Sequence, residues 1–274
     1  MNRTVADKRA AFRRLHAQGC FVLPNPWDVG SARMLQGLGF EALATTSSGH
    51  AWSQGQADGA LPRASVLAHL RTIVAATDLP VNADFESGFA SDAPGVAESV
   101  RMAVDTGVAG ISIEDSTGDV NRPLRDVGEA VARLRAARAA IDDSGADVLL
   151  IGRAENFFLG QPDLDDTILR LRAYADAGAD CLYAPGIRTR EQIAAVVAAV
   201  APKPVNLLIG GASEFTLQDV AAMGVRRISV GGALARAAWA GFLRAARGIA
   251  QDGRFDGLAD ATSGQELNAF FGQR

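Results

Sequence analysis

Two carboxylates, Asp84 and Glu86, follow a run of strand-forming residues in the stretch PVNADFESGFA. Because side chains alternate across a strand, residues two apart point to the same face. Glu114 ends the next apolar run, VAGISIED, and is expected beside them. Three carboxylates packed this closely raise each other's pKa unless a cation neutralises them. We therefore predict a metal site of Asp84, Glu86 and Glu114 that holds Mg²⁺, with Mn²⁺ as the second choice, since Mg²⁺ takes oxygen ligands and keeps several waters.

Arg153 lies in the following apolar run, DVLLIGRAE, and offers an alternative partner for the carboxylates. An arginine among three acids can form a structural ion-pair network without any metal. Arg153 can also hold the carboxylate of a substrate through two parallel hydrogen bonds, because its guanidinium is planar and always charged. We favour the metal site with Arg153 as a catalytic and substrate-binding residue.

The stretch TTSSGHAWSQGQADG suggests where a second charged group of the substrate would bind. Small hydroxyl residues before a glycine, here Ser47, Ser48 and Gly49, expose backbone N–H groups that can form a cup for a carboxylate or an enolate oxygen. An ordinary Ser/Gly turn is the alternative. A metal on one side and this cup on the other would bind a 2-oxo acid through its carboxylate and its ketone oxygen.

Eight apolar runs separated by helical patterns must position these residues. Several helical patterns end in glycine before the next run, which is typical of a helix leading into a buried strand. Continuous apolar strands belong to parallel sheets covered on both faces, and eight such units in one chain indicate an α/β fold, a closed (β/α)₈ barrel of the TIM type. An open doubly wound sheet is the competing architecture, but no glycine fingerprint follows the first run. The runs centre on Val22, Leu43, Val81, Ile111, Leu149, Leu182, Leu207 and Ile228.

In such barrels the chemistry lies at the carboxyl ends of the strands. The polar residues above all follow apolar runs, as do Tyr183 and Asn206, which we expect to contact substrate. Any strand that reaches solvent also ends in polar residues, so this placement alone does not prove a site.

Composition excludes several other classes of protein. The chain has 274 residues, is 48% hydrophobic and 21% charged, and carries a net charge of −4 with scattered basic residues. This distribution predicts no nucleic-acid or anionic-membrane partner. The two cysteines lie in apolar stretches, and no apolar segment approaches the roughly 20 residues of a membrane span. We expect a cytoplasmic protein with one barrel domain over residues 1–274, including an N-terminal helix and a C-terminal helical extension.

Four motifs resemble the isocitrate lyase/phosphoenolpyruvate mutase superfamily in order and spacing: LPNPWDVGSARMLQGLGFEALATTSSG, PVNADFESGFA, GISIEDS and GRAENFFLG. The resemblance covers Phe21 to Ala240. It implies an α/β barrel with Mg²⁺ that acts on small 2-oxo acids through a pyruvate-like enolate. It also implies a homodimer or homotetramer in which neighbouring barrels swap the eighth helix, here near LARAAWAGFLRAARGIA, and QELNAFFG could extend that contact.

The resemblance also implies roles for individual residues. Asp84 matches the principal metal carboxylate, while Glu86 and Glu114 match positions that hold metal-bound waters. Arg153 matches the arginine that grips the substrate. The remaining matches are Ser47, Ser48 and Gly49 in the oxyanion and carboxylate cup, and Asp58, an acidic residue that faces the metal waters.

The chain departs from the superfamily where acids and bases are usually found. It lacks the Lys-Lys-Cys-Gly-His segment of isocitrate and methylisocitrate lyases, since EDSTGDVNRPLRDV contains neither Cys nor Lys. YAPG replaces a His and a Ser typical of the mutase and phosphonopyruvate hydrolase, and VGGALA lacks the His of the oxaloacetate decarboxylase branch. The enolate-stabilising groups are therefore present without the specialised proton-transfer groups.

Two residues remain as candidates for moving a proton. His50 is the one histidine expected at the barrel mouth, and its ordinary pKa suits the role, although it could simply pack beneath the loop. Tyr183 is the other candidate. We predict a Mg²⁺-dependent lyase that cleaves or decarboxylates a small 2-oxo or 2-hydroxy acid. The alternatives are P–C bond chemistry of the mutase or hydrolase type, a phosphate-binding barrel suggested by LIGGAS and SVGGALA, and a barrel that binds a 2-oxo acid without catalysis.

Overall fold

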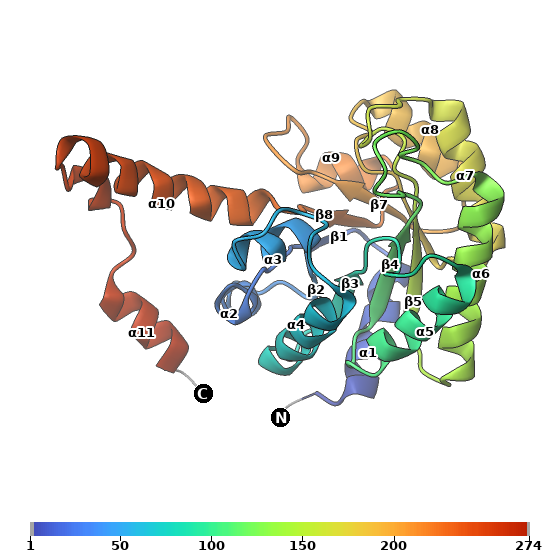
Figure 1. Cartoon of the computed structure of the whole chain (residues 1–274), viewed down its shortest axis with the longest axis horizontal. Helices are drawn as coiled ribbons and strands as arrows, with labels where there is room; N and C mark the ends of the chain where they lie inside the picture. Colours follow the sequence, from blue (N-terminus) through green and yellow to red (C-terminus); the bar gives the residue numbers. More distant parts are fainter. Residues whose placement is uncertain (1–2, 273–274) are drawn as a thin grey trace.

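The computed structural model describes residues 3–272 and contains eight parallel strands that alternate with helices (Figure 1). The strands pair in the order β1-β8-β7-β6-β5-β4-β3-β2. They are β1 Phe21–Leu23, β2 Leu43–Ala44, β3 Val81–Asp84, β4 Gly110–Glu114, β5 Leu149–Arg153, β6 Cys181–Tyr183, β7 Val205–Leu208 and β8 Arg227–Ser229. All eight predicted strands and the (β/α)₈ architecture are confirmed.

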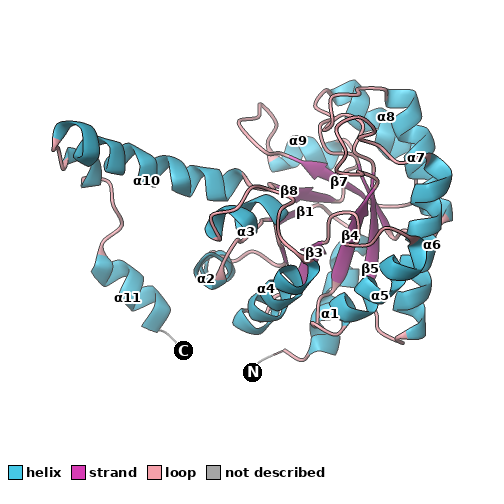
Figure 2. Cartoon of the chain, viewed as in Figure 1, coloured by secondary structure: helices cyan, strands magenta, loops and turns pink. Residues whose placement is uncertain are grey.

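Most helices lie around the strands, whereas α10 Ala233–Asp252 and α11 Gly264–Gly272 extend away from them (Figure 2). The other helices are α1 Val5–Ala17, α2 Val29–Gly37, α3 Ser47–Ser53, α4 Arg63–Ala76, α5 Ala93–Val104, α6 Val127–Asp143, α7 Leu164–Asp176, α8 Arg190–Val200 and α9 Leu217–Ala222, with a short 3₁₀ helix at Asp256–Leu258. Side-chain caps at many of their N-termini fix where they begin; Thr189 and Gln192, for example, form a capping box on α8.

The barrel closes between β1 and β2, whose pairing consists of little more than one backbone bond. The amide of Ala44 donates to the carbonyl of Pro24 at 3.1 Å. The side chain of Asn25 strengthens this seam, because its Nδ2 donates to Thr45 O at 2.9 Å and its Oδ1 accepts from the amides of Val230 and Gly231, each at 2.9 Å. Asn25 therefore ties the ends of the β1, β2 and β8 segments together at the barrel mouth.

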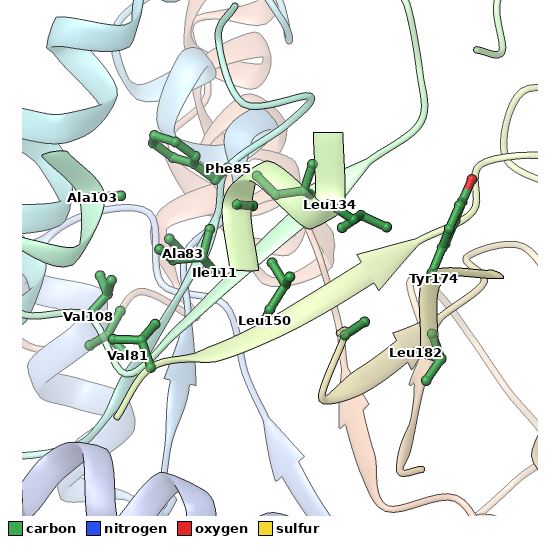
Figure 3. Close-up of a cluster of buried hydrophobic side chains, with 14 of the residues drawn as sticks. Val81, Ala83, Phe85, Ala103, Val108, Ile111, Leu134, Leu150, Tyr174 and Leu182 are labelled. Atoms are coloured by element: carbon green, nitrogen blue, oxygen red, sulfur yellow. The ribbon is translucent and has the colours of Figure 1, made fainter. Parts of the chain in front are cut away.

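The larger hydrophobic core lies between the strands and the surrounding helices (Figure 3). Ile111 on β4 and Leu150 on β5 are fully buried there, and Leu134 of α6 packs against the same layer. Burying such a side chain contributes about 1.5–3 kcal/mol, so this layer holds the strand ends in register. That register places Glu114, Arg153 and Tyr183 side by side on neighbouring strands.

A smaller core fills the inside of the barrel and is closed from the N-terminal end by α1. Phe12 of α1 is fully buried and belongs to this cluster together with Phe21. Gly110 on β4 leaves room for it, since a Cβ there would lie 2.7 Å from the Phe12 ring and 2.5 Å from Asn82 Oδ1. The predicted N-terminal helix is thus the plug of the barrel.

Helix α10 projects away from the barrel, and α11 follows it as a separate segment (Figure 1). Helix α11 contacts α2: the Arg33 side chain of α2 donates through Nη2 to the backbone carbonyl of Phe271 at 3.3 Å, and a Cβ on Gly37 would clash with the Phe270 ring. The predicted C-terminal helical extension lies here. The exchange of α10 between subunits stays a prediction. Among residues 3–272, no helix is both long and apolar enough to cross a membrane.

Candidate active site

The carboxyl ends of the strands surround a cavity of about 710 Å³. Several of the predicted residues line it, and they are Ser47, Ser48, Asp58, Asp84, Arg153 and Tyr183. Trp52 of α3 and the glycines that follow β7 and β8 complete its wall. The cavity therefore lies at the carboxyl ends of the strands, where the barrel architecture predicted it.

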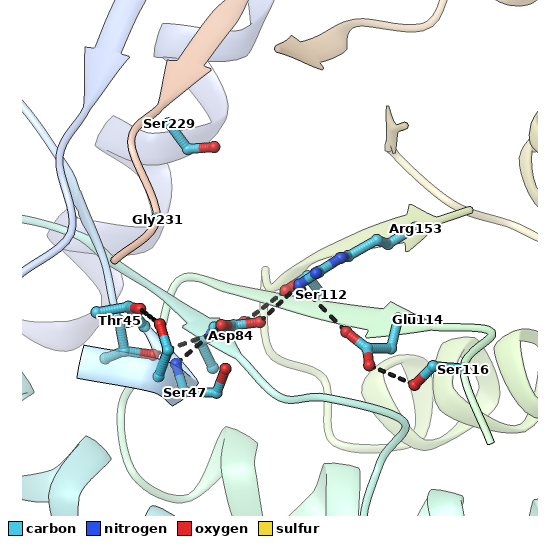
Figure 4. A network of polar contacts seen from close by, with 12 residues as sticks. Thr45, Ser47, Asp84, Ser112, Glu114, Ser116, Arg153, Ser229 and Gly231 are labelled. Atoms are coloured by element: carbon cyan, nitrogen blue, oxygen red, sulfur yellow. Dashed lines mark hydrogen bonds and ion pairs between the residues drawn. The ribbon is translucent and has the colours of Figure 1, made fainter. Parts of the chain in front are cut away.

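Arg153 lies at the centre of the acidic group (Figure 4). Its Nη1 lies 3.2 Å from Asp84 Oδ1 and 3.1 Å from Glu114 Oε2. Its Nε and Nη2 contact Glu155, the latter at 3.2 Å, so Glu155 fixes the plane of the guanidinium. The ring of Tyr183 lies 5.2 Å from the Arg153 carbon Cζ and adds a cation–π contact. The ion-pair network considered from the sequence is thus present.

Glu86 extends the acidic group from the loop after β3. Its backbone has φ of 47°, a left-handed conformation that is uncommon outside glycine. Burial, followed by the charges of Asp84, Glu114 and Asp58, raises the pKa of Glu86 to about 8. Burial likewise raises the pKa of Glu114, although Arg153 opposes it. The one guanidinium therefore does not neutralise the acids around it.

This excess of negative charge raises the question of whether the residues can hold a divalent cation. No three His, Cys, Asp or Glu side chains within residues 3–272 converge closely enough to ligate one ion together. Mg²⁺, however, is usually held by one or two carboxylates and keeps its remaining waters, so a tight three-ligand cluster is not required. Asp84 at the cavity wall, with Glu86 and Glu114 at a longer range, offers hard oxygen donors and an excess of negative charge. The donor set fits.

The predicted carboxylate cup is the first turn of a short helix rather than a loop turn. Thr46 caps α3, and its Oγ1 accepts from Gly49 N at 3.3 Å. The amide of Ser47 donates to Asp84 Oδ2 at 3.0 Å, and Thr45 Oγ1 accepts from Asp84 N at 3.0 Å. Gly49 itself is buried under the turn, where a Cβ would lie 2.7 Å from Thr46 Cγ2. The Ser47 amide therefore faces Asp84, the acid that is predicted to hold the metal.

The remaining predicted residues do not line this cavity; they are Gly49, His50, Glu86, Glu114 and Asn206. His50 is buried in α3 and stacks on His69 of α4, with ring centroids 3.7 Å apart and an angle of 11°. It does not reach the mouth, because the helix turns it toward α4 instead. Asn206 is fully buried below the cavity, where Oδ1 accepts from Arg227 and Nδ2 donates to Ser229 Oγ at 2.9 Å.

Other polar residues at the site were missed by the sequence reasoning. Glu155 holds Arg153, and Arg227 and Ser229 of β8 line the deeper cavity. The alternation of polar residues on β8 was the available signal, since Arg227 and Ser229 are two apart and share the inner face.

Comparison with known proteins gives consistent results. Residues 12–250 match the family model described as phosphoenolpyruvate phosphomutase. A protein from Burkholderia cenocepacia J2315, assigned as a lyase or mutase, has 48% identity and a TM-score of 0.95, covering 98% of this chain and 97% of that one. An oxaloacetate decarboxylase of Paraburkholderia xenovorans is 32% identical over 81% of this chain and 74% of its own length. The structure of 2,3-dimethylmalate lyase has 29% identity and a TM-score of 0.85, covering 98% and 95%.

Proposed function

Since the chain belongs to the phosphoenolpyruvate mutase/isocitrate lyase superfamily, we propose that this lyase uses a divalent cation, Mg²⁺ or Mn²⁺, to cleave a C–C bond of a small 2-oxo or 2-hydroxy acid. The observation that carries the proposal is the excess of carboxylates around one arginine at the mouth of the barrel. The bound cation would act as a Lewis acid on the oxo-acid oxygens. Asp84 would hold this cation, and Glu86 and Glu114 would hold its waters.

The chain's own residues then bind and orient the acid. Arg153 is held by Glu155 on its Nε and Nη2 side, which leaves Nη1 directed at Asp84 and Glu114. Nη1 is the part of the guanidinium that would donate to the substrate carboxylate, since Glu155 holds the other nitrogens. At the start of α3 the Ser48 amide would supply a further donor, whereas the Ser47 amide already donates to Asp84 Oδ2. Such preorganised donors stabilise charge that builds up on an enolate oxygen.

Tyr183 is our candidate for returning the proton. Burial, opposed by Arg153, raises the pKa of its phenol to about 12, so Oη keeps its hydrogen at neutral pH. In decarboxylation of a 2-oxo diacid, the electron pair of the broken C–C bond moves to the ketone oxygen, CO₂ leaves, and a proton is added at carbon. In cleavage of a 2-hydroxy diacid, the hydroxyl loses its proton and becomes the ketone of a 2-oxo acid product. Asp58, at the cavity rim, is our candidate base for that hydroxyl.

A substrate panel tests the proposal. Oxaloacetate, 2,3-dimethylmalate, 2-methylisocitrate and phosphonopyruvate are incubated with the protein in Mg²⁺, in Mn²⁺ or in EDTA, and pyruvate, glyoxylate and phosphate are followed. We expect metal-dependent pyruvate from at least one diacid. Phosphate from phosphonopyruvate would instead establish P–C chemistry, and metal-dependent binding without turnover would establish a binding barrel.

An arginine variant connects any activity to this cavity. Arg153→Met removes a charge-assisted hydrogen bond of about 3 kcal/mol, so kcat/KM should fall roughly 100-fold. Arg101→Met on the exposed side of α5 is the matched control and should keep wild-type activity. Unchanged turnover in the Arg153 variant would place the reaction elsewhere.

A further inference from the structure

Arg227 is a buried cation for which the proposed chemistry has no use. It is the first residue of β8, its side chain points into the barrel, and only 2% of the residue is exposed. It nevertheless lines the cavity, together with Asn82, Ser112 and Ser229. The guanidinium therefore forms part of the cavity floor, beneath the carboxylates of the mouth.

The hydrogen-bond partners of Arg227 are all uncharged. Its Nε donates to Asn206 Oδ1 at 2.8 Å, and Nη1 lies 3.3 Å from His16 Nε2 and 3.4 Å from Asn82 Oδ1. His16 is neutral, because burial and then the charge of Arg227 lower its pKa to about 3. Within residues 3–272, Arg227 forms no ion pair, and its Nη2 has no hydrogen-bond acceptor.

An unpaired buried charge is costly, because several kcal/mol of hydration are lost without a compensating ion pair. A fold keeps such a group when something supplies the missing charge. The acids of the mouth do not supply it, since Asp84, Glu86 and Glu114 are arranged around Arg153. An anion that enters the cavity would supply this missing negative charge.

We infer that Arg227, with Ser229 and Asn82, forms an anion subsite at the cavity floor that binds the second carboxylate of a dicarboxylic substrate. Asn82 precedes Asp84 by two residues on β3, so the floor lies about 6.6 Å below the acid that is predicted to hold the metal. A short dicarboxylate can span one such layer, with its 2-oxo or 2-hydroxy end above and its other carboxylate below. Identifying the ligand as the substrate rests on the proposed function; the anion subsite itself does not.

The subsite also bears on which bond breaks. An arginine that holds a carboxylate stabilises its charged form, and CO₂ carries no charge, so such a contact would oppose loss of that carboxylate. In cleavage between C2 and C3 of a 2-hydroxy dicarboxylate, the electron pair moves onto C3 and into this same carboxylate, which stays charged. The subsite therefore fits a diacid whose second carboxylate survives in the product.

Binding of two unreactive acids tests the subsite without turnover. Succinate and butyrate share a four-carbon chain and differ in one carboxylate, and their affinities for the Mg²⁺-loaded protein can be measured by calorimetry. We expect succinate to bind at least tenfold more tightly than butyrate. Arg227→Gln should erase this preference, and Arg227→Lys should keep part of it. Arg236→Gln, at the exposed outer rim, is the matched control and should keep all of it.

A soaked wild-type crystal gives a readout that does not depend on a variant folding. In sodium bromide we expect an anomalous peak in contact with the Arg227 guanidinium. An unchanged succinate preference in Arg227→Gln, or a bromide-soaked crystal without that peak, would overturn the subsite. If the subsite holds while no diacid is turned over, the proposed function fails alone. If a diacid is turned over and Arg227→Gln binds succinate like the wild type, the subsite fails alone.

Discussion

For Arg153, residue types and their spacing in the sequence predicted only some of the contacts that the structure shows. An ion pair between this arginine and the carboxylates was the alternative to the favoured metal site, and the structure places its Nη1 within 3.2 Å of Asp84 and Glu114. The sequence did not indicate Glu155 as the partner that fixes the guanidinium, since residues two apart after a strand end can point in many directions. His50 was expected at the mouth and is buried against α4 instead, because a seven-residue helix replaces the expected turn.

The His50–His69 pair predicts a loss of stability in acid. Burial lowers the pKa of His50, and burial, followed by the charge of His50, lowers that of His69 to about 4. Among the described residues, His50 has no hydrogen-bond partner at either ring nitrogen. Both histidines are therefore harder to protonate in the folded state than in the unfolded state. The free energy of unfolding is fully retained above the ordinary histidine pKa of about 6.5, and part of it is lost as the pH falls toward 4. For His69 the loss is at most about 3 kcal/mol, less after solvent screening.

The double variant His50→Phe with His69→Phe keeps two stacked rings and removes the titration. Urea unfolding at pH 7 and pH 5 should show a smaller loss of stability for this variant than for the wild type. His16, whose pKa lies near 3, remains in both proteins and supplies the shared background. Equal losses in the two proteins would contradict the assignment.

At the scale of elements, the strands were predictable and the loops were not. Apolar runs of three to five residues marked each strand, because a parallel strand covered on both faces has little choice of residue. The loop after β3 could not be derived from pattern alone. Glu86 and Phe89 both have positive φ, at 47° and 52°, and neither is glycine. Such a conformation costs energy and persists where neighbouring groups hold it.

Arg133 of α6 is the residue that holds this loop. It is 2% exposed, and its Nη2 donates to the carbonyls of Ser87 at 2.6 Å and Ala90 at 2.8 Å. Arg133→Met should let the loop relax, lower the melting temperature and weaken Mn²⁺ binding about tenfold, as loss of an outer support typically does. Calorimetry measures both. Arg135→Met, exposed on the same helix, is the control. Wild-type Mn²⁺ affinity in the Arg133 variant would show that the loop needs no such support.

At the scale of the molecule, the barrel was fully predictable and the assembly was not. Eight repeats of strand and helix specify the closed sheet, whereas a neighbouring subunit leaves only an exposed apolar surface in one chain. Helix α10 carries such a surface: Trp239, Phe242 and Ile249 are 39%, 60% and 38% exposed. Their spacing places them along one side of the helix, with arginines on the other.

We propose that α10 is buried against another copy of this chain, in a homodimer or homotetramer formed by helix exchange. Full burial of such a side chain contributes about 1.5–3 kcal/mol, and covering the part that is still exposed contributes a corresponding fraction. Trp239→Glu with Phe242→Glu should therefore convert the assembly to monomers in light scattering after size exclusion. Arg247→Glu, on the polar side of α10, should leave the mass unchanged. A wild-type protein that is monomeric at micromolar concentration would refute the exchange.

The metal site is tested most directly by anomalous diffraction from crystals soaked in Mn²⁺. We predict a peak about 2.0–2.2 Å from a carboxylate oxygen of Asp84, with Glu86 and Glu114 reaching the ion through water and Arg153 released from Asp84. Crystals of Asp84→Asn should lack this peak. A wild-type crystal that shows no peak at Asp84, while Arg153 still bridges Asp84 and Glu114, would contradict the account.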